Sequence, residues 1–369
     1  WGPAFPFGRK SNNAWLPLRC DVCPSGGLIS ATAVFQKRGD EVLVPLVGLS
    51  DLLRPARQAG YGVGAFNVFN VESVRAVIDA AEAEGAPVIL MTGANDLAAT
   101  GEAYLGELAL RAAERASVPV CVHLDHSRSF DLVMRCIRMG YTSVMIDGSH
   151  LEFEDNVALT RSVVEYAHDH GVSVEAELGT LGGIEEDVKG TVKLTDPAQA
   201  EDFVERTGCD ALAVAIGTSH GAYKFKGEPK LALDLIPEIY RRVRIPLVMH
   251  GSSSVPAELV EEVNRFGGAL AGSKGVPIES IQRAIQLGVR KINVDTDIRL
   301  AVTATIRKFF AEQPSKFDPR EYLGPAREAI AQVVRSRMEA FGSAGHATDY
   351  QPISLAEMKE YYRTAGARR

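Results

Sequence analysis

The chain has 369 residues, of which 46% are hydrophobic and 24% are charged, and its formal net charge is −7. This composition is typical of a globular protein, and the scattered lysines and arginines do not form the basic surface that nucleic-acid binding requires. No apolar run approaches the roughly 20 residues of a membrane-spanning helix. We therefore expect neither a nucleic acid nor a membrane as a partner.

The five cysteines favour a reducing compartment. Their number is odd and their spacing is wide, which is typical of free thiols, so we expect a cytoplasmic location. Cys20 and Cys23 form a lone C-x-x-C, which without a second pair or a nearby histidine is a weak zinc signal.

Residues 1–45 show no sustained hydrophobic period, and we interpret them as a poorly ordered N-terminal extension. Their arginines suit a transit peptide, which would place the protein in a plastid instead. Asp21, Asp40 and Glu41 argue against that alternative. We expect a catalytic domain over 46–345 and a C-terminal tail over 346–369.

From Val47 onward, short apolar runs alternate with amphipathic stretches, and Gly, Pro, Asp or Ser marks each boundary. The predicted strands are Val63–Asn67, Pro87–Met91, Val118–Asp125, Ser143–Asp147, Val172–Leu178, Ala211–Ala215, Pro246–His250 and Lys291–Asp295. Helices predicted between them include Val71–Glu84, Phe130–Met139, Asn156–His170, Ala198–Thr207 and Pro256–Phe266. Eight such units predict an α/β fold, a (β/α)8 TIM barrel, with additional helices at 277–287 and 321–341.

Polar residues occur at or just after the ends of seven of these eight strands. They are Asn67, Asp125 with His126, Asp147, Glu177, His220, His250, and Asn293 with Asp295. In a TIM barrel the catalytic groups gather at this end of the strands. A single polar residue there is usually a cap, but the repetition predicts one shared site.

Three of the eight histidines, His126, His220 and His250, belong to this set. Three imidazoles that leave one position open are the ligand set of a catalytic zinc or a similar divalent ion. His168 and His170 lie near a predicted helix end, where a surface role is the simpler interpretation.

Glycine-rich or hydroxyl-rich segments follow strands six, seven and eight, at Gly217–Gly221, His250–Ser254 and Asn293–Asp297. Small residues and backbone N–H groups beside a strand end bind oxyanions. Their position on the last three strands predicts a phosphate site.

The sequence resembles the class II, metal-dependent fructose-bisphosphate aldolases, most closely the subtype associated with the Calvin cycle, over about residues 46–365. The resemblance is carried by five segments in order: Val120–His126, Glu175–Gly179, Ile216–Lys224, His250–Ser254 and Lys291–Asp297. It implies cleavage of fructose 1,6-bisphosphate into dihydroxyacetone phosphate and glyceraldehyde 3-phosphate, through a metal-stabilised enediolate.

The resemblance also implies roles for individual residues. It places zinc, or another divalent metal, on His126, His220 and His250, and it allows a monovalent cation in addition. Asp125 matches the group that handles the proton of the C4 hydroxyl, and Glu185 matches the acid that exchanges the C3 proton. Asp147 and Glu177 match acids near an alternate metal position. The residues that match substrate contacts are Asn67, Gly221, Lys224, Gly251, Ser253, Asn293, Asp295, Thr296 and Arg299.

Arg299 matches an arginine that reaches the second phosphate, in related enzymes from the neighbouring subunit, so the resemblance implies a homodimer or a higher even-numbered homo-oligomer. After strand two, the chain reads Met91–Leu97 where this subtype usually has Ser, Gly-Ala, basic residues and Tyr. Tagatose bisphosphate or another ketose bisphosphate therefore stays an alternative substrate. A metal-dependent barrel hydrolase is a distant alternative, since it would carry an H-x-H pair on strand one, and a non-catalytic scaffold is another.

Overall fold

The computed structural model describes residues 36–38, 41–43, 46–180, 182–185, 188–189, 193–220, 231–270, 272–350, 360 and 362–364. The side chains of 36–38, 41–43, 182–185, 188–189 and 220 are not described. Cys20, Cys23, Gly221 and Lys224 lie outside the described residues. The predictions made for these four residues stay predictions.

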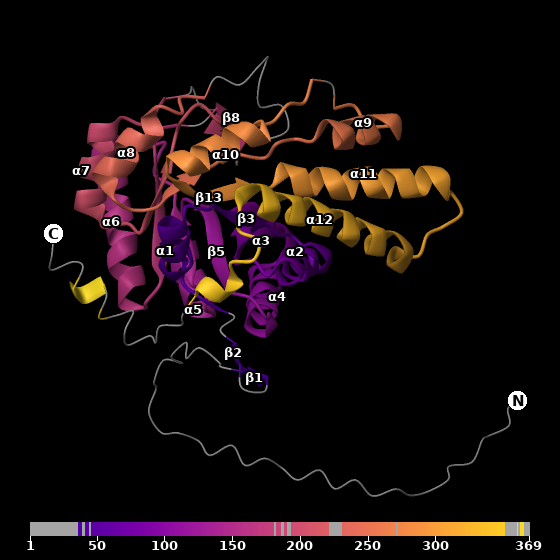
Figure 1. Cartoon of the computed structure of the whole chain (residues 1–369), viewed down its shortest axis with the longest axis horizontal. Coiled ribbons are helices and arrows are strands. Elements are labelled where there is room, and N and C mark those ends of the chain that lie inside the picture. Colours follow the sequence, from indigo (N-terminus) through magenta and orange to yellow (C-terminus); the bar gives the residue numbers. More distant parts are fainter. Residues whose placement is uncertain are drawn as a thin grey trace, which may run out of the picture. The chain divides into compact units, whose positions relative to one another are not determined.

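Eight parallel strands close into a barrel within the described residues (Figure 1). In chain order they are β3 (Val63–Asn67), β4 (Val88–Gly93), β5 (Val120–Ser127), β6 (Ser143–Ile146), β7 (Ser173–Leu178), β10 (Ala211–Val214), β12 (Leu247–Met249) and β13 (Val289–Val294). Each strand pairs with the next, and β13 pairs with β3 to complete the ring. The predicted (β/α)8 barrel is confirmed.

Helices surround the barrel and connect its strands (Figure 1). They are α1 (Leu49–Ala59), α2 (Val71–Glu84), α3 (Ala94–Thr100), α4 (Glu102–Arg115), α5 (Phe130–Met139), α6 (Phe153–Asp169), α7 (Pro197–Thr207), α8 (Leu235–Val243), α9 (Ala257–Arg265), α10 (Ile278–Leu287), α11 (Thr296–Glu312) and α12 (Pro319–Phe341). Local signals fix their ends: a capping box of Asn70 and Ser73 starts α2, and the left-handed Gly85 ends it. None of the described helices has the length and apolarity that a bilayer crossing requires.

Two small sheets lie outside the barrel. β1 (Gln36–Arg38) and β2 (Glu41–Leu43) pair antiparallel, within the segment where the sequence predicts no element. β8 (Gly182–Glu185), β9 (Val188–Lys189) and β11 (Ser219–His220) form the other sheet, with β8 between its two partners. This second sheet brings the segment after β7 against the segment after β10.

The barrel strands are buried on both faces, because one face meets the surrounding helices and the other fills the barrel interior. Phe66, Leu90 and Val122 point toward the helices and belong to the outer apolar layer. Their neighbours Ala65 and Ile89 belong to the inner cluster.

Candidate active site

His126 lies where β5 departs from regular pairing. The register between β5 and β6 shifts between Leu124 and Ser127, and the backbone of His126 has a positive φ of 42°. A bulge of this kind changes the direction of a side chain. A left-handed backbone conformation at a residue other than glycine is energetically unfavourable, and such strained conformations occur mostly at functional sites. The strand end is therefore shaped to direct the His126 imidazole.

Asp125, on β5, is held by two side-chain amides, one from β3 and one from β13. Asn67 Nδ2 donates to one carboxylate oxygen at 3.0 Å, and Asn293 Nδ2 donates to the other at 3.2 Å. All three side chains are buried. Asp125 is fixed as an ionised hydrogen-bond acceptor beside His126.

His126 and His250 lie together among carboxylates. Their ring centroids are 4.4 Å apart, and the ligand atoms of Asp125, His126 and His250 all lie within 4.8 Å of one another. His126 also groups with Asp147 and Glu177 within the same limit. Imidazole and carboxylate donors converging in a buried site are the ligands that zinc and other divalent ions prefer, so these residues fit a divalent cation.

Burial and neighbouring charges shift the pKa values of several groups in this cluster. Burial alone would raise the pKa of Asp125, but the positive charges of His126 and Lys291 lower that pKa to about 2. Burial and His126 lower the pKa of His250, yet its hydrogen bonds to Glu175 and Glu177 raise it to about 9. Burial opposes ionisation of Asp147, but the hydrogen bond from His126 holds its pKa well below the usual range. The cluster thus keeps Asp125 and Asp147 ionised and favours a positive charge on His250.

The backbone brings the third predicted ligand to the same place. In the small sheet Ser219 pairs with Gly182, and His220 pairs with Gly183, two residues before Glu185. Gly251, directly after His250, has a φ of 59°, and a Cβ there would lie 2.6 Å from the Ser219 carbonyl oxygen. Only glycine fits this approach of the His250 turn to the β11 strand.

The predicted phosphate residues gather where β12 and β13 end. Ser253 Oγ accepts hydrogen bonds from the backbone N–H groups of Asp295 and Thr296, both at 3.1 Å. Thr296 begins α11, so the first turn of a long helix faces this loop. The N-terminus of a helix favours anions, as a phosphate site requires.

Arg299, on the first turns of α11, is paired within its own chain. Its Nε donates to Asp295 at 2.6 Å and its Nη2 to Asp96 at 3.2 Å. The guanidinium lies 5.6 Å from the ring centroid of Phe69, and half of the side chain is exposed. The arginine is thus held at the barrel mouth with part of its surface open.

A buried polar layer beneath the site was not singled out from the sequence. Lys291 Nζ lies 2.9 Å from Glu175 and 2.8 Å from Asn293, and His250 Nε2 lies 2.7 Å from Glu175. Glu175 and Lys291 are fully buried. The signal was present, since Glu175 and Lys291 each precede a predicted site residue by two positions in a strand and so share its face.

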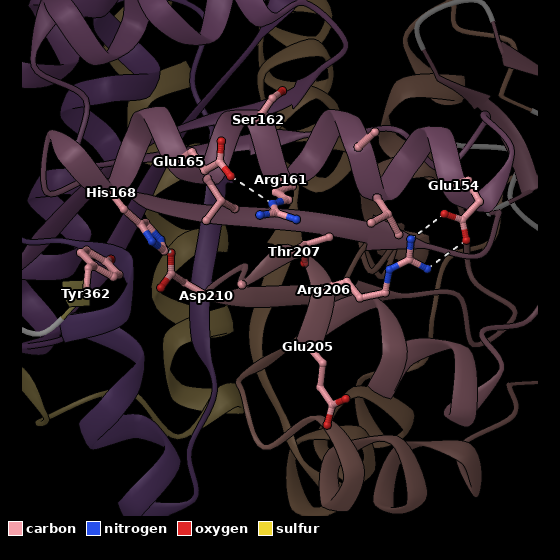
Figure 2. Close-up of a pocket in the computed structure, with 14 residues that line it drawn as sticks. Glu154, Arg161, Ser162, Glu165, His168, Glu205, Arg206, Thr207, Asp210 and Tyr362 are labelled. Atoms are coloured by element: carbon pink, nitrogen blue, oxygen red, sulfur yellow. Dashed lines mark hydrogen bonds and ion pairs between the residues drawn. The ribbon is translucent and has the colours of Figure 1, made fainter. Parts of the chain in front are cut away.

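A separate hollow lies on the outer wall between α6 and α7, away from these groups (Figure 2). Its volume is ≈ 780 Å³, and Arg206 bridges to Glu154 on one side of it. At its other end His168 bonds Asp210 at 2.8 Å and stacks on Tyr362. Of the predicted site residues that the structure describes, none lines this hollow.

Residues 47–346 match the family described as "Fructose-bisphosphate aldolase class-II". The chain belongs to this family. It is therefore a class II aldolase, and enzymes of this class depend on a divalent metal and carry out aldol cleavage rather than hydrolysis. The predicted family and activity are confirmed.

Relatives of this aldolase carry the same name. A fructose-bisphosphate aldolase of Giardia intestinalis is 53% identical over 323 residues, which cover 87% of this chain and all of the relative. One from Thermus caldophilus is 52% identical and covers 80% of this chain and 98% of its own. The crystal structure of the YdjI aldolase from Escherichia coli K12 superposes with a TM-score of 0.68 at 32% identity, over 82% of this chain and 99% of that one.

Proposed function

We propose that this class II aldolase reversibly cleaves fructose 1,6-bisphosphate to dihydroxyacetone phosphate and glyceraldehyde 3-phosphate, with zinc as its metal. The observation that carries the proposal is the buried convergence of Asp125, His126 and His250 at one end of the barrel. In this proposal His126, His220 and His250 hold the metal, and Asp147 and Glu177 serve an alternate metal position. A bound divalent ion stabilises negative charge that develops beside the ketone as a Lewis acid.

The chain's own side chains move the protons and hold the substrate. Asp125, ionised and anchored by Asn67 and Asn293, accepts the proton of the C4 hydroxyl as the carbon–carbon bond breaks. Glu185 exchanges the C3 proton of dihydroxyacetone phosphate. Its strand β8 is hydrogen-bonded to β11, which supports a place close to His220. A monovalent cation beside the phosphate belongs to the same proposal.

Most of the remaining proposed substrate contacts lie at the ends of β12 and β13, where a phosphate site is predicted. Asp295 and Thr296 adjoin Ser253 through its two hydrogen bonds, and Gly251 lies two residues before Ser253 in the same turn, which supports a single phosphate pocket there. Gly221 and Lys224 are proposed to complete it.

The substrate is tested by assaying fructose and tagatose 1,6-bisphosphates side by side, with and without a chelator. We expect fructose 1,6-bisphosphate to be cleaved with the larger kcat/KM, and both activities to disappear in the chelator. Faster cleavage of tagatose 1,6-bisphosphate would reassign the substrate but leave the aldol reaction in place. Full activity after metal removal would contradict the proposal itself.

Arg299 is proposed to bind the distal phosphate of a substrate in the adjacent protomer of a dimer or a multiple of dimers. Its partly exposed, permanently charged fork suits a phosphate dianion. We expect Arg299→Ala to raise KM for the bisphosphate roughly 10- to 100-fold, and to change the affinity for dihydroxyacetone phosphate far less. Arg307→Ala, an exposed arginine on the same helix, is the matched control.

Mixed dimers show whether Arg299 acts in the active site of its own chain or in that of the adjacent protomer. At a substrate concentration near the wild-type KM, Arg299→Ala and Asp125→Asn chains should each be strongly impaired alone. They should recover activity when combined, because one kind of site then holds an intact Asp125 and an intact Arg299. Dimers that form without any recovery would place Arg299 in the site of its own chain. A fully active monomer by light scattering would contradict the assembly.

A cytoplasmic location also stays a proposal, with a plastid as its alternative. The buried free thiols of Cys121, Cys136 and Cys209 support a reducing compartment.

A further inference from the structure

Lys291 is the cation at the centre of the buried layer beneath the metal site. It lies on β13, its side chain has no exposed surface, and it makes two polar contacts from one ammonium group. Nζ lies 2.9 Å from Glu175 Oε2 and donates to Asn293 Oδ1 at 2.8 Å. Because a buried ammonium is costly unless it is paired, these contacts fix the geometry of both partners.

The first branch runs from Lys291 to a metal ligand. With Glu175 Oε2 on Lys291, the other oxygen, Oε1, lies 2.7 Å from His250 Nε2. A carboxylate beside an ammonium is ionised and can only accept, so Nε2 of His250 is the donor and carries the proton. The other nitrogen, Nδ1, is hydrogen-bonded to Glu177 Oε2 at 3.2 Å, and Glu177 is one of the carboxylates that group with His126.

The second branch runs from Lys291 to Asp125. The ammonium needs an acceptor, so it holds the Asn293 amide with its oxygen toward Nζ. The Nδ2 group of the same amide is thereby turned toward Asp125, to which it donates at 3.2 Å. Lys291 and Asp125 therefore select the same orientation of the Asn293 amide, because a reversed amide would put its oxygen against the Asp125 carboxylate and its NH2 group against the ammonium.

We propose that Lys291 is a positioning residue which, through Glu175, presents Nδ1 of His250 to the metal and, through Asn293, holds Asp125 in place. The inference rests on the proposed function, since it concerns the same site. It assigns a role to a residue that is not among the predicted metal ligands and substrate contacts. Partners of this kind typically contribute 10- to 100-fold to metal affinity.

The test measures zinc affinity by titrating the zinc-loaded full-length protein with a chromogenic chelator. Lys291→Met keeps much of the side-chain volume and removes the charge, and we expect zinc affinity to fall about 10- to 100-fold. The matched control is Arg290→Met, because Arg290 is a buried cation on the same strand whose contacts are Ile285, Val289 and Tyr240, on the helix side. Arg290→Met should keep zinc affinity within about twofold.

A charge-balanced variant covers the case in which Lys291→Met does not fold. Glu175→Gln combined with Lys291→Met removes both charges, and this double variant should still lose zinc affinity about 10- to 100-fold. Where the single variants fold, their losses should not add, because both act through one contact. Wild-type zinc affinity in folded Lys291→Met, or in the double variant, would overturn the inference.

The same titration separates this inference from the proposed function. Wild-type protein that binds no zinc and cleaves no ketose bisphosphate would refute the proposed function. Wild-type protein that does both, with unchanged affinity in the Lys291 variants, would refute the role of Lys291 alone.

Discussion

Replacing His250 with alanine is expected to abolish both zinc retention and aldol cleavage. The imidazole is almost fully buried between His126 and two glutamates, so its loss removes a proposed ligand and leaves Glu175 and Glu177 without their shared partner. Loss of a residue that hydrogen-bonds to a metal ligand typically lowers metal affinity 10- to 100-fold. Loss of the ligand itself should lower metal affinity by more than about 100-fold. Metal content after gel filtration and the rate of fructose 1,6-bisphosphate cleavage measure the effect.

His168→Ala is the matched control for this substitution. His168 is also a histidine bonded to a carboxylate, but it is only half-buried and lies on the outer wall beside Asp210 and Tyr362 (Figure 2). It should keep its zinc and its activity. Zinc and activity retained in folded His250→Ala would rule His250 out as a ligand.

Asp125→Asn is expected to slow carbon–carbon cleavage by about 10²- to 10⁴-fold, the usual contribution of a general acid–base group. An asparagine has the same shape but cannot accept the C4 proton, and one of the two amides that hold Asp125 loses its acceptor. Exchange of the C3 proton of dihydroxyacetone phosphate should stay largely intact. Glu185→Gln, in contrast, should slow both reactions.

Two assays distinguish these steps: a coupled assay for cleavage, and loss of isotope from C3-labelled dihydroxyacetone phosphate for exchange. Asp131→Asn, an exposed aspartate at the start of α5, serves as the control and should leave both rates unchanged. Small and equal losses in Asp125→Asn and Glu185→Gln would contradict the division of roles.

The barrel could be predicted because its strands and helices carry local signals. The bounds predicted for β3, α2 and α5 are those of the structure, since capping residues, glycines and hydrophobic period agree there. Other strands shift by one or two residues; β5, for instance, extends to Ser127 rather than ending at Asp125. That difference arises from the irregular pairing near His126, which depends on the neighbouring strand and has no local sequence signal.

The candidate site was predicted by selecting polar residues at the ends of strands. This criterion explains which site residues were identified and which were missed. It selects Asp125, His126 and His250, which the structure brings together. It ignores Glu175 and Lys291, which lie earlier in their strands and meet only because the closed barrel brings β7 and β13, which are not paired with each other, together across its interior. Such contacts depend on register across the barrel, which residue type alone does not specify.

Zinc titration of the metal-depleted enzyme tests the central claim most directly. After dialysis against a chelator, fructose 1,6-bisphosphate cleavage should be lost, and it should return in proportion to added zinc until each chain holds a single catalytic ion. The His250→Ala protein should recover nothing over the same range. Full cleavage activity in protein shown to contain no divalent metal would contradict the claim that this barrel is a metal-dependent aldolase.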